Sequence, residues 1–200
     1  MTKRATTWLL SAGLAVSCLA SMAWSQTEGK PRVEVKTTQG DIVLELEPEK
    51  APVTVENFLK YVNSGFYKGT IFHRVIDGFM IQGGGFTIDM KKKTTPYPAI
   101  KLESRNGLKN KKYTVAMART NVPDSATSQF FINVVDNPRL DYPNPDGHGY
   151  AVFGTVISGE DVVDKIRAVK TTTKNGYEDV PMEAVMITGV SLLDSEGDSH

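Results

Sequence analysis

Hydrophobic and polar residues alternate with a period of two along most of the chain. The pattern is clearest at 32–37 and 41–46, which flank a glycine-bearing turn and predict a β-hairpin. Six further strands are predicted at 71–76, 79–82, 113–118, 129–134, 151–157 and 185–193. Eight short strands in one domain favour a barrel or a sandwich, and closing a barrel removes the unpaired edges of the sheet.

Two segments have the three- and four-residue spacing of an amphipathic helix instead. In the segment 51–65 the apolar residues with this spacing are Val55, Phe58, Leu59 and Val62. Thr54 can cap the start of this helix and Gly65 can end it. In the segment 159–169 the equivalent residues are Val162, Val163, Ile166 and Val169. Each helix has one apolar face that must be covered, so we expect the two helices to plug the open ends of the barrel.

The first residues have the pattern of an export signal. Lys3 and Arg4 precede a mostly apolar segment, and Ala23-Trp24-Ser25 has small residues at its first and third positions. The segment is too short and wrongly flanked for a membrane span, so residues 1–25 are predicted to be a secretory signal peptide that is cleaved off. A bacterial lipoprotein signal with lipid attachment at Cys18 is the alternative.

Cysteine content and net charge limit the compartment and the partners of the remaining chain. Cys18 is the only cysteine, and secretion without a disulfide fits the bacterial periplasm. Two of the 23 basic residues, Lys3 and Arg4, lie in the signal, so 21 remain against 23 acidic residues. Without a basic excess, neither nucleic acid nor an anionic membrane is an expected partner. We read residues 31–194 as one domain and 195–200 as a polar tail.

Several familiar kinds of catalytic site are absent from the sequence. His73, His148 and His200 are scattered and have no cysteine nearby, so no metal site and no cofactor are expected. There is no Gly-x-Ser-x-Gly element of an acyl-transfer serine. The glycines at 83–85 lack the Lys-Ser/Thr of a phosphate loop, and they fit a strand end where the backbone turns or approaches another group closely.

Arg74 is the most informative residue, because it stands in the middle of an apolar run, "TIFHRVIDGFMIQGGGF". Burying an arginine costs several kcal/mol unless its donors are matched, so this side chain either reaches water or has a function. In a strand, His73 should point to the opposite face, where we expect a buried, hydrogen-bonded histidine of the core rather than a catalytic base. Arg74 then faces outward, toward a surface shared with neighbouring strands.

Several motifs carry a family resemblance. "FHRVIDGFMIQGG", "SQFFI" and "GYAVFG", in this order, resemble the cyclophilin family of peptidyl-prolyl cis-trans isomerases. "QGGGF", "NGLKN", "AMART" and "DSATSQFFINV" are similar to its periplasmic bacterial branch. The resemblance covers nearly all of residues 31–194. It implies an all-β fold, a closed eight-stranded antiparallel barrel capped by two α-helices, and isomerisation of Xaa-Pro bonds in unfolded exported proteins.

The resemblance also implies roles for individual residues. It assigns catalysis to Arg74, and Gln82 is expected to orient its guanidinium. The positions that match the substrate groove and proline pocket of the family are Phe79, Met80, Ala118, Arg119, Gln129, Phe131, Leu140 and Tyr150. On the pattern alone, the apolar members of this set are equally compatible with an ordinary core, and the glutamines with solvated strand positions.

The sequence departs from the family at two positions of the pocket rim. Arg139 stands where eukaryotic members typically carry a tryptophan that contacts cyclosporin, so we expect weak cyclosporin binding. Tyr150 replaces a histidine that is common in those members. We expect a monomer that acts on proline-containing polypeptides. The alternatives are a non-catalytic module that retains proline-containing segments, which should tolerate the loss of Arg74, and a structural envelope protein.

Overall fold

The computed structural model describes residues 29–193. The predicted signal peptide at 1–25, the alternative lipid site at Cys18 and the tail at 195–200 lie outside these residues. The strands of the described part are β1 Arg32–Thr37, β2 Gly40–Leu46, β3 Thr70–Ile76, β4 Met80–Thr87, β5 Thr114–Met117, β6 Phe130–Asn133, β7 Val152–Ser158, β8 Thr171–Lys174, β9 Tyr177–Pro181 and β10 Ile187–Leu193. Its helices are α1 Pro52–Asn63, α2 Glu160–Arg167 and two short 3-10 helices, η1 Pro123–Ser125 and η2 Pro138–Leu140.

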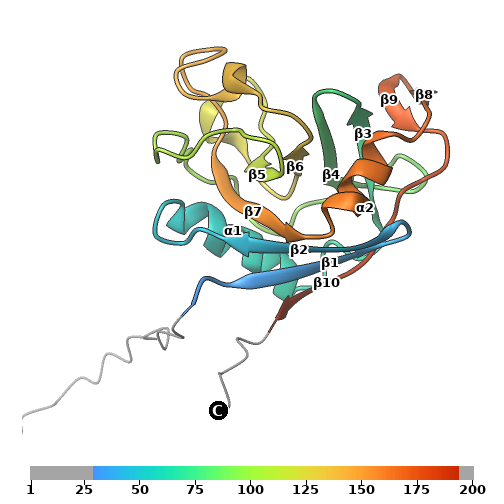
Figure 1. Cartoon of the computed structure of the whole chain (residues 1–200), viewed down its shortest axis with the longest axis horizontal. Coiled ribbons are helices and arrows are strands. Elements are labelled where there is room, and N and C mark those ends of the chain that lie inside the picture. Colours follow the sequence, from blue (N-terminus) through green and yellow to red (C-terminus); the bar gives the residue numbers. More distant parts are fainter. Residues whose placement is uncertain (1–28, 194–200) are drawn as a thin grey trace, which may run out of the picture.

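All eight predicted strands are present, and they form one antiparallel sheet in the order β10-β1-β2-β7-β5-β6-β4-β3 (Figure 1). β4 extends to Thr87 rather than ending at Gln82. The hairpin β8–β9 forms a second, two-stranded sheet that was not predicted. The all-β class, with an eight-stranded main sheet and two α-helices, is therefore confirmed.

The predicted closure of the barrel is not confirmed, because the sheet is an open, strongly curled half-barrel (Figure 1). The edge strands β3 and β10 meet only near one end. There, Ile71 bridges Met186, and the N–H of Phe72 donates to the Val185 carbonyl at 2.9 Å. Register shifts near Phe72 interrupt the pairing of β3 with β4, and β9 also packs against β3.

Helix α1 starts differently from the prediction. Thr54 lies inside the helix and does not cap it, since the first helical residue is Pro52. The carboxylate of Glu103 instead accepts the N–H of Val53 at 3.1 Å and the N–H of Thr54 at 2.8 Å. These are two of the N–H groups that a helix start leaves without a partner. The cap is therefore supplied by a distant loop.

The end of α1 follows the prediction. Gly65 has a φ of +66°, its N–H donates to the Val62 carbonyl at 3.0 Å, and the N–H of Phe66 donates to the Tyr61 carbonyl at 3.1 Å. This pair of bonds is the Schellman motif, which favours glycine because of its left-handed residue.

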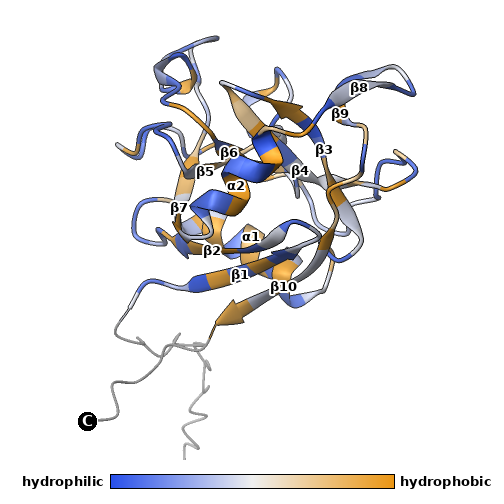
Figure 2. Ribbon diagram, turned by 45° about the vertical axis from the view of Figure 1, so that its right-hand side comes forward, coloured by the Kyte–Doolittle hydropathy of each residue, from blue (hydrophilic) through white to orange (hydrophobic). Residues whose placement is uncertain are grey.

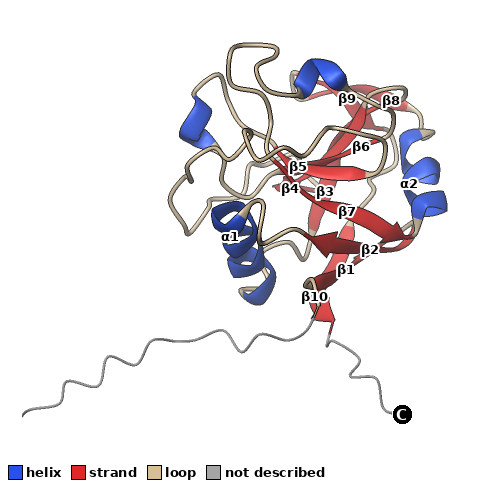
Figure 3. Ribbon diagram, turned by 60° about the vertical axis from the view of Figure 1, so that its left-hand side comes forward, coloured by secondary structure: helices blue, strands red, loops and turns tan. Residues whose placement is uncertain are grey.

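The two helices lie on opposite sides of the curled sheet (Figure 3). Both helices carry apolar as well as polar residues (Figure 2). The apolar residues with helical spacing are buried, as predicted. In α2 the buried residues are Val162, Val163 and Ile166. Val169 lies beyond the end of α2 and packs against the core. Large aromatic side chains fill the centre of the core, among them Tyr61, Tyr67, Phe58, Phe72, Phe130 and Phe153.

His73 is buried as predicted, but its surroundings differ from the prediction. Its residue is 5% exposed, but the Nδ1 atom has no hydrogen-bond partner in the described part of the chain. The ring lies against Phe86, with 4.4 Å between centroids. Phe86 belongs to a second apolar cluster that also contains Val180 of β9, separate from the main core. The register shifts around Phe72 break the alternation on which the prediction rested.

Candidate active site

A cavity of about 120 Å³ opens on the outer side of the sheet. Nine of the ten predicted site residues line it: Arg74, Phe79, Met80, Gln82, Ala118, Arg119, Phe131, Leu140 and Tyr150. The tenth, Gln129, is not part of the lining but accepts a hydrogen bond from Gln82 at 3.0 Å. Residues from β3, β4 and β6 and from the segments after β5 and around η2 thus come together at one place.

The register of the sheet produces this grouping. Arg74 of β3 is paired with Gln82 of β4, Gln82 is paired with Phe131 of β6, and Phe131 is paired with Ala116 of β5. Directly opposite residues of neighbouring strands put their side chains on the same face of a sheet. These four residues therefore form a row across four strands, and Arg74 stands at its end.

The floor of the cavity is apolar and separate from the main core. Met80, Ala116, Phe131 and Val152 form a buried cluster of their own. The partly buried residues packed against it are Ile76, Phe79, Leu108, Ala118, Leu140 and Tyr150. The ring of Tyr150 meets Phe131 edge to face at 5.8 Å. The apolar residues predicted for the site therefore form a lined recess on the outer face.

Arg74 stands at the edge of this recess with 44% of its side chain exposed. Its Nε lies 3.7 Å from Oδ2 of Asp179, which comes from β9. The expected contact from Gln82 to Arg74 is not observed among the described residues. The Nε2 of Gln82 donates instead to Oε1 of Gln129 at 3.0 Å. Gly85 makes room for this pair, since a Cβ there would lie 2.4 Å from Cγ of Gln129.

Arg119 lines the cavity, but its polar end is occupied. The side chain is 1% exposed, and its Nε and Nη2 donate to the Gly149 carbonyl at 2.9 and 2.8 Å. Nη2 also donates to both carboxylate oxygens of Asp146 at 2.8 Å, and Nη1 donates to the Thr120 carbonyl at 2.9 Å. The hydrogen bonds from Arg119 lower the pKa of the Asp146 carboxyl group. The guanidinium, 4.5 Å from the Tyr150 ring, therefore holds the rim segment.

The far wall is tied to the floor through backbone groups. The N–H of Tyr150 donates to the Leu140 carbonyl at 2.9 Å, so the two predicted wall residues are joined directly. The side-chain amide of Asn137 donates to the Phe79 carbonyl at 2.8 Å. These bonds fix the 3-10 helix η2 beside β4, which explains why residues far apart in sequence line one recess.

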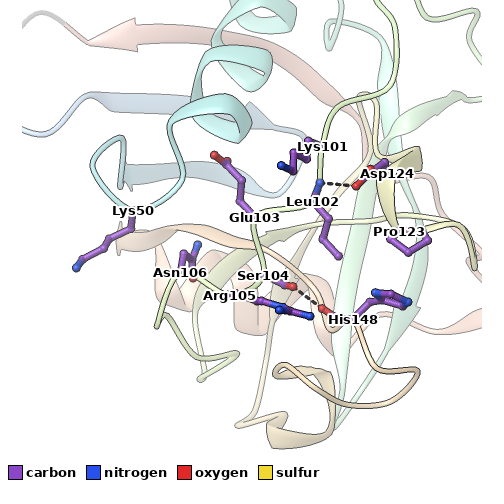
Figure 4. A pocket seen from close by; sticks show the side chains of 10 residues that line it. All are labelled: Lys50, Lys101, Leu102, Glu103, Ser104, Arg105, Asn106, Pro123, Asp124 and His148. Atoms are coloured by element: carbon purple, nitrogen blue, oxygen red, sulfur yellow. Dashed lines mark hydrogen bonds between the residues drawn. The ribbon is translucent and has the colours of Figure 1, made fainter.

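A larger hollow of about 670 Å³ lies elsewhere, between the start of α1 and the loop 101–106 (Figure 4). Most of the residues that line it are polar or charged, and none of them is a predicted site residue. Its acidic groups are engaged: Glu103 caps α1, and Asp124 accepts the N–H of Leu102 at 2.9 Å. The smaller cavity is the candidate active site, because it holds nine of the predicted residues and lies over the apolar cluster of Met80 and Phe131.

Residues 32–192 match the family described as cyclophilin type peptidyl-prolyl cis-trans isomerase/CLD. The chain belongs to this family. Over 163 residues it is 60% identical to a peptidyl-prolyl cis-trans isomerase of Streptomyces antibioticus, covering 80% of this chain and 98% of the relative. It is 55% identical over 162 residues to peptidyl-prolyl cis-trans isomerase B of Escherichia coli, covering 80% and 98%. The protein is a peptidyl-prolyl cis-trans isomerase.

Solved structures agree with the fold. A cyclophilin of Cryptosporidium parvum matches with a TM-score of 0.69 and 26% identity, covering 83% of this chain and 99% of that one. The same protein determined in the presence of the dipeptide Ala-Pro matches with a TM-score of 0.68 and 27% identity, covering 82% and 99%. In the part of the chain that the structure describes, no helix is long and apolar enough to cross a membrane.

Sequence reasoning missed two residues next to the site, Asp179 and Asp146. Asp179 belongs to a hairpin that was not predicted, although Asn175-Gly176 between two short runs is a strong two-residue turn signal. Asp146 lies in a loop rich in Pro, Asn and Gly, and no local pattern indicates that its partner is Arg119.

Proposed function

We propose that Arg74 accelerates the rotation of Xaa-Pro bonds by donating a hydrogen bond to the prolyl nitrogen in the twisted transition state. The barrier of roughly 20 kcal/mol comes from delocalisation of the nitrogen lone pair into the carbonyl. As the bond twists, this lone pair becomes localised and able to accept a hydrogen bond. A donor that acts only at that stage binds the transition state better than the substrate, which is what catalysis requires.

The observation that carries the proposal is one small cavity with a cation at its edge and an apolar floor. Its volume of about 120 Å³ suits a single small ring rather than a large ligand. Phe131, Met80 and Phe79 would hold the proline ring by apolar contact while the preceding carbonyl swings. Apolar surroundings also lower the local dielectric, which strengthens a hydrogen bond from Arg74. The Cryptosporidium relative determined with Ala-Pro supports a proline-containing ligand.

The remaining groove residues serve the substrate backbone in this proposal. Gln82 and Gln129 form a hydrogen-bonded pair beside the cavity, and the amide groups that this bond leaves over can meet peptide N–H and carbonyl groups. Ala118 offers a small, apolar edge to the groove. Arg119 is assigned a different task from the one expected, because its donors hold the rim formed by Asp146 and Gly149.

The setting is proposed to be the periplasm, with unfolded exported proteins as clients and a monomer as the working unit. The pattern of residues 1–25 supports export, and lipid attachment at Cys18 remains the alternative. Mass spectrometry of the protein recovered from a Gram-negative host distinguishes the two. We expect an unmodified chain that begins at Gln26. A chain that begins with a lipidated Cys18 would replace this proposal by membrane anchoring.

The catalytic proposal is tested with residues 26–200 and a short Xaa-Pro peptide whose cis-to-trans conversion is followed optically. Arg74→Ala should lower kcat/KM by about a hundredfold, the typical cost of one transition-state donor. The matched control is Arg32→Ala, which removes an exposed arginine of β1 that is paired with Glu45. Equal activity of the two variants would refute the role of Arg74. No acceleration by the unmodified protein, with the peptide still bound, would favour a non-catalytic binding module.

A further inference from the structure

Arg74 needs a partner that orients it. An arginine side chain is long and flexible and carries five donors, so a guanidinium without a fixed contact samples many positions. Gln82 was expected to supply this contact, but no hydrogen bond joins it to Arg74 in the described part of the chain, and its Nε2 donates to Gln129. Among the described residues, the carboxylate that lies within ion-pair distance of Arg74 is Asp179, at 3.7 Å from Nε.

We propose that Asp179 is a positioning residue that orients the guanidinium of Arg74 for the isomerase reaction. The proposal rests on the proposed role of Arg74 and extends it to β9. The contact is made to the Nε of Arg74, which leaves the two terminal nitrogens for the cavity that this side chain lines. The carboxylate acts through Arg74 and does not touch the substrate.

The hairpin β8–β9 holds Asp179 in place from the outside of the sheet. Val180, the next residue, is 3% exposed and packs in the second apolar cluster with Ile71 of β3 and Phe86 of β4. The ring of Tyr177 meets Phe86 edge to face at 5.0 Å. Two apolar anchors on either side of Asp179 therefore fix the strand that carries it against the strand that carries Arg74.

The backbone at Asp179 supports the same reading. Its φ is +59°, in the left-handed region that residues other than glycine seldom occupy, although aspartate tolerates it better than most. This conformation interrupts the regular alternation of β9 at the residue that meets Arg74. The neighbouring Glu178 is exposed and forms no ion pair with another described residue. Glu178 is therefore a matched control for Asp179, because it is a carboxylate on the same strand that does not meet Arg74.

The expected change in kcat follows from how exposed the Arg74–Asp179 ion pair is. The side chains of Arg74 and Asp179 are 44% and 36% exposed, so water and salt screen the pair and it is weaker than a buried one. For exposed pairs of this kind, loss of one partner changes an equilibrium by up to about fivefold. We therefore expect Asp179→Asn to lower kcat about fivefold and to leave KM within twofold, because proline binding depends on the apolar floor.

The first experiment compares Asp179→Asn with Glu178→Gln in the full protein, with kcat and KM measured for an Xaa-Pro peptide at low and at high salt. High salt should bring the unmodified protein toward the rate of Asp179→Asn and should leave the variant unchanged. Glu178→Gln should behave as the unmodified protein. Equal rates for the two variants, or a faster Asp179→Asn, would overturn the proposal.

A second measurement separates orientation from a merely structural role. In the Arg74→Lys background, which has no Nε to hold, Asp179→Asn should change kcat by less than twofold. A full fivefold loss there would overturn the proposal, since the effect would then not pass through Arg74. The NMR signal of the Arg74 Nε–H provides a readout without turnover: it should shift and exchange faster with water in Asp179→Asn. An unchanged signal contradicts the proposal even if the protein proves inactive.

Discussion

His73 should make the stability of the protein depend on pH below neutrality. The residue belongs to β3 and is 5% exposed, and its ring lies against Phe86 of β4. Burial, with a smaller contribution from the charge of Arg74, lowers the pKa of His73 from 6.5 to about 4. The folded chain keeps His73 neutral, so protonation of His73 in the unfolded chain favours unfolding.

The sign follows from proton binding. Between pH 6.5 and about 4 the unfolded chain binds a proton at His73 and the folded chain does not, so stability is lost as the pH falls through this window. The full difference corresponds to ~3 kcal/mol in the free energy of unfolding, and most of it should be lost by about pH 4.5. Above pH 6.5 the contribution of His73 to the pH dependence disappears.

Urea unfolding at several pH values between 7.5 and 4.5 measures this loss. His73→Phe keeps a ring against Phe86 and removes the titration, so it should lose roughly 2–3 kcal/mol less than the unmodified protein over this range. The control is His148→Gln, which removes an exposed histidine and should follow the unmodified protein. If His73→Phe and the unmodified protein lose stability in parallel, the burial of a neutral His73 is not the cause.

Three further predictions concern the rim, the cap of α1 and an inhibitor. Asp146→Asn should loosen the rim that Arg119 holds and raise KM by about threefold with little change in kcat; a lower kcat at constant KM would contradict it. Glu103→Ala should lower the free energy of unfolding by about 1–2 kcal/mol through loss of the cap, whereas Glu103→Gln, which keeps an acceptor, should lose less. Cyclosporin titrated into the isomerase assay should inhibit weakly because Arg139 replaces the tryptophan, and tight nanomolar inhibition would contradict that reading.

Local patterns were sufficient where the structure depends on neighbouring residues. The hairpin of β1 and β2 follows from period-two alternation around a turn, and the end of α1 follows from Gly65, which adopts the left-handed conformation that the motif requires. The buried face of α2 follows from helical spacing. In each case the interacting groups lie within a few residues of one another.

Predictions failed where the deciding contact comes from far along the chain. Threonine is a residue type that often caps helices, but at α1 the acceptor comes from Glu103, 49 residues from Thr54. The alternation through His73 is broken by register shifts in β3 that no composition rule indicates. The strand β8 is exposed at every position, so it carries no alternating burial pattern, and only its Asn-Gly turn marks it.

The candidate site shows the same division. The family resemblance selected ten residues, and nine of them line one cavity, because aligned strands bring the motifs together. The resemblance could not indicate which polar groups would meet. Gln82 bonds to Gln129, Arg74 meets Asp179, and the donors of Arg119 are used on the rim. Such pairings depend on side-chain rotamers and on which distant segments of the chain pack together.

The most direct test of catalysis by Arg74 is NMR exchange spectroscopy on an Xaa-Pro peptide bound to the protein, because it separates binding from isomerisation. We predict that Arg74→Ala slows cis-trans exchange of the bound peptide by about a hundredfold while Kd changes by less than threefold. Unchanged exchange in the bound peptide would contradict donation by Arg74. A loss of affinity as large as the loss of rate would contradict it as well, since Arg74 would then act on the ground state.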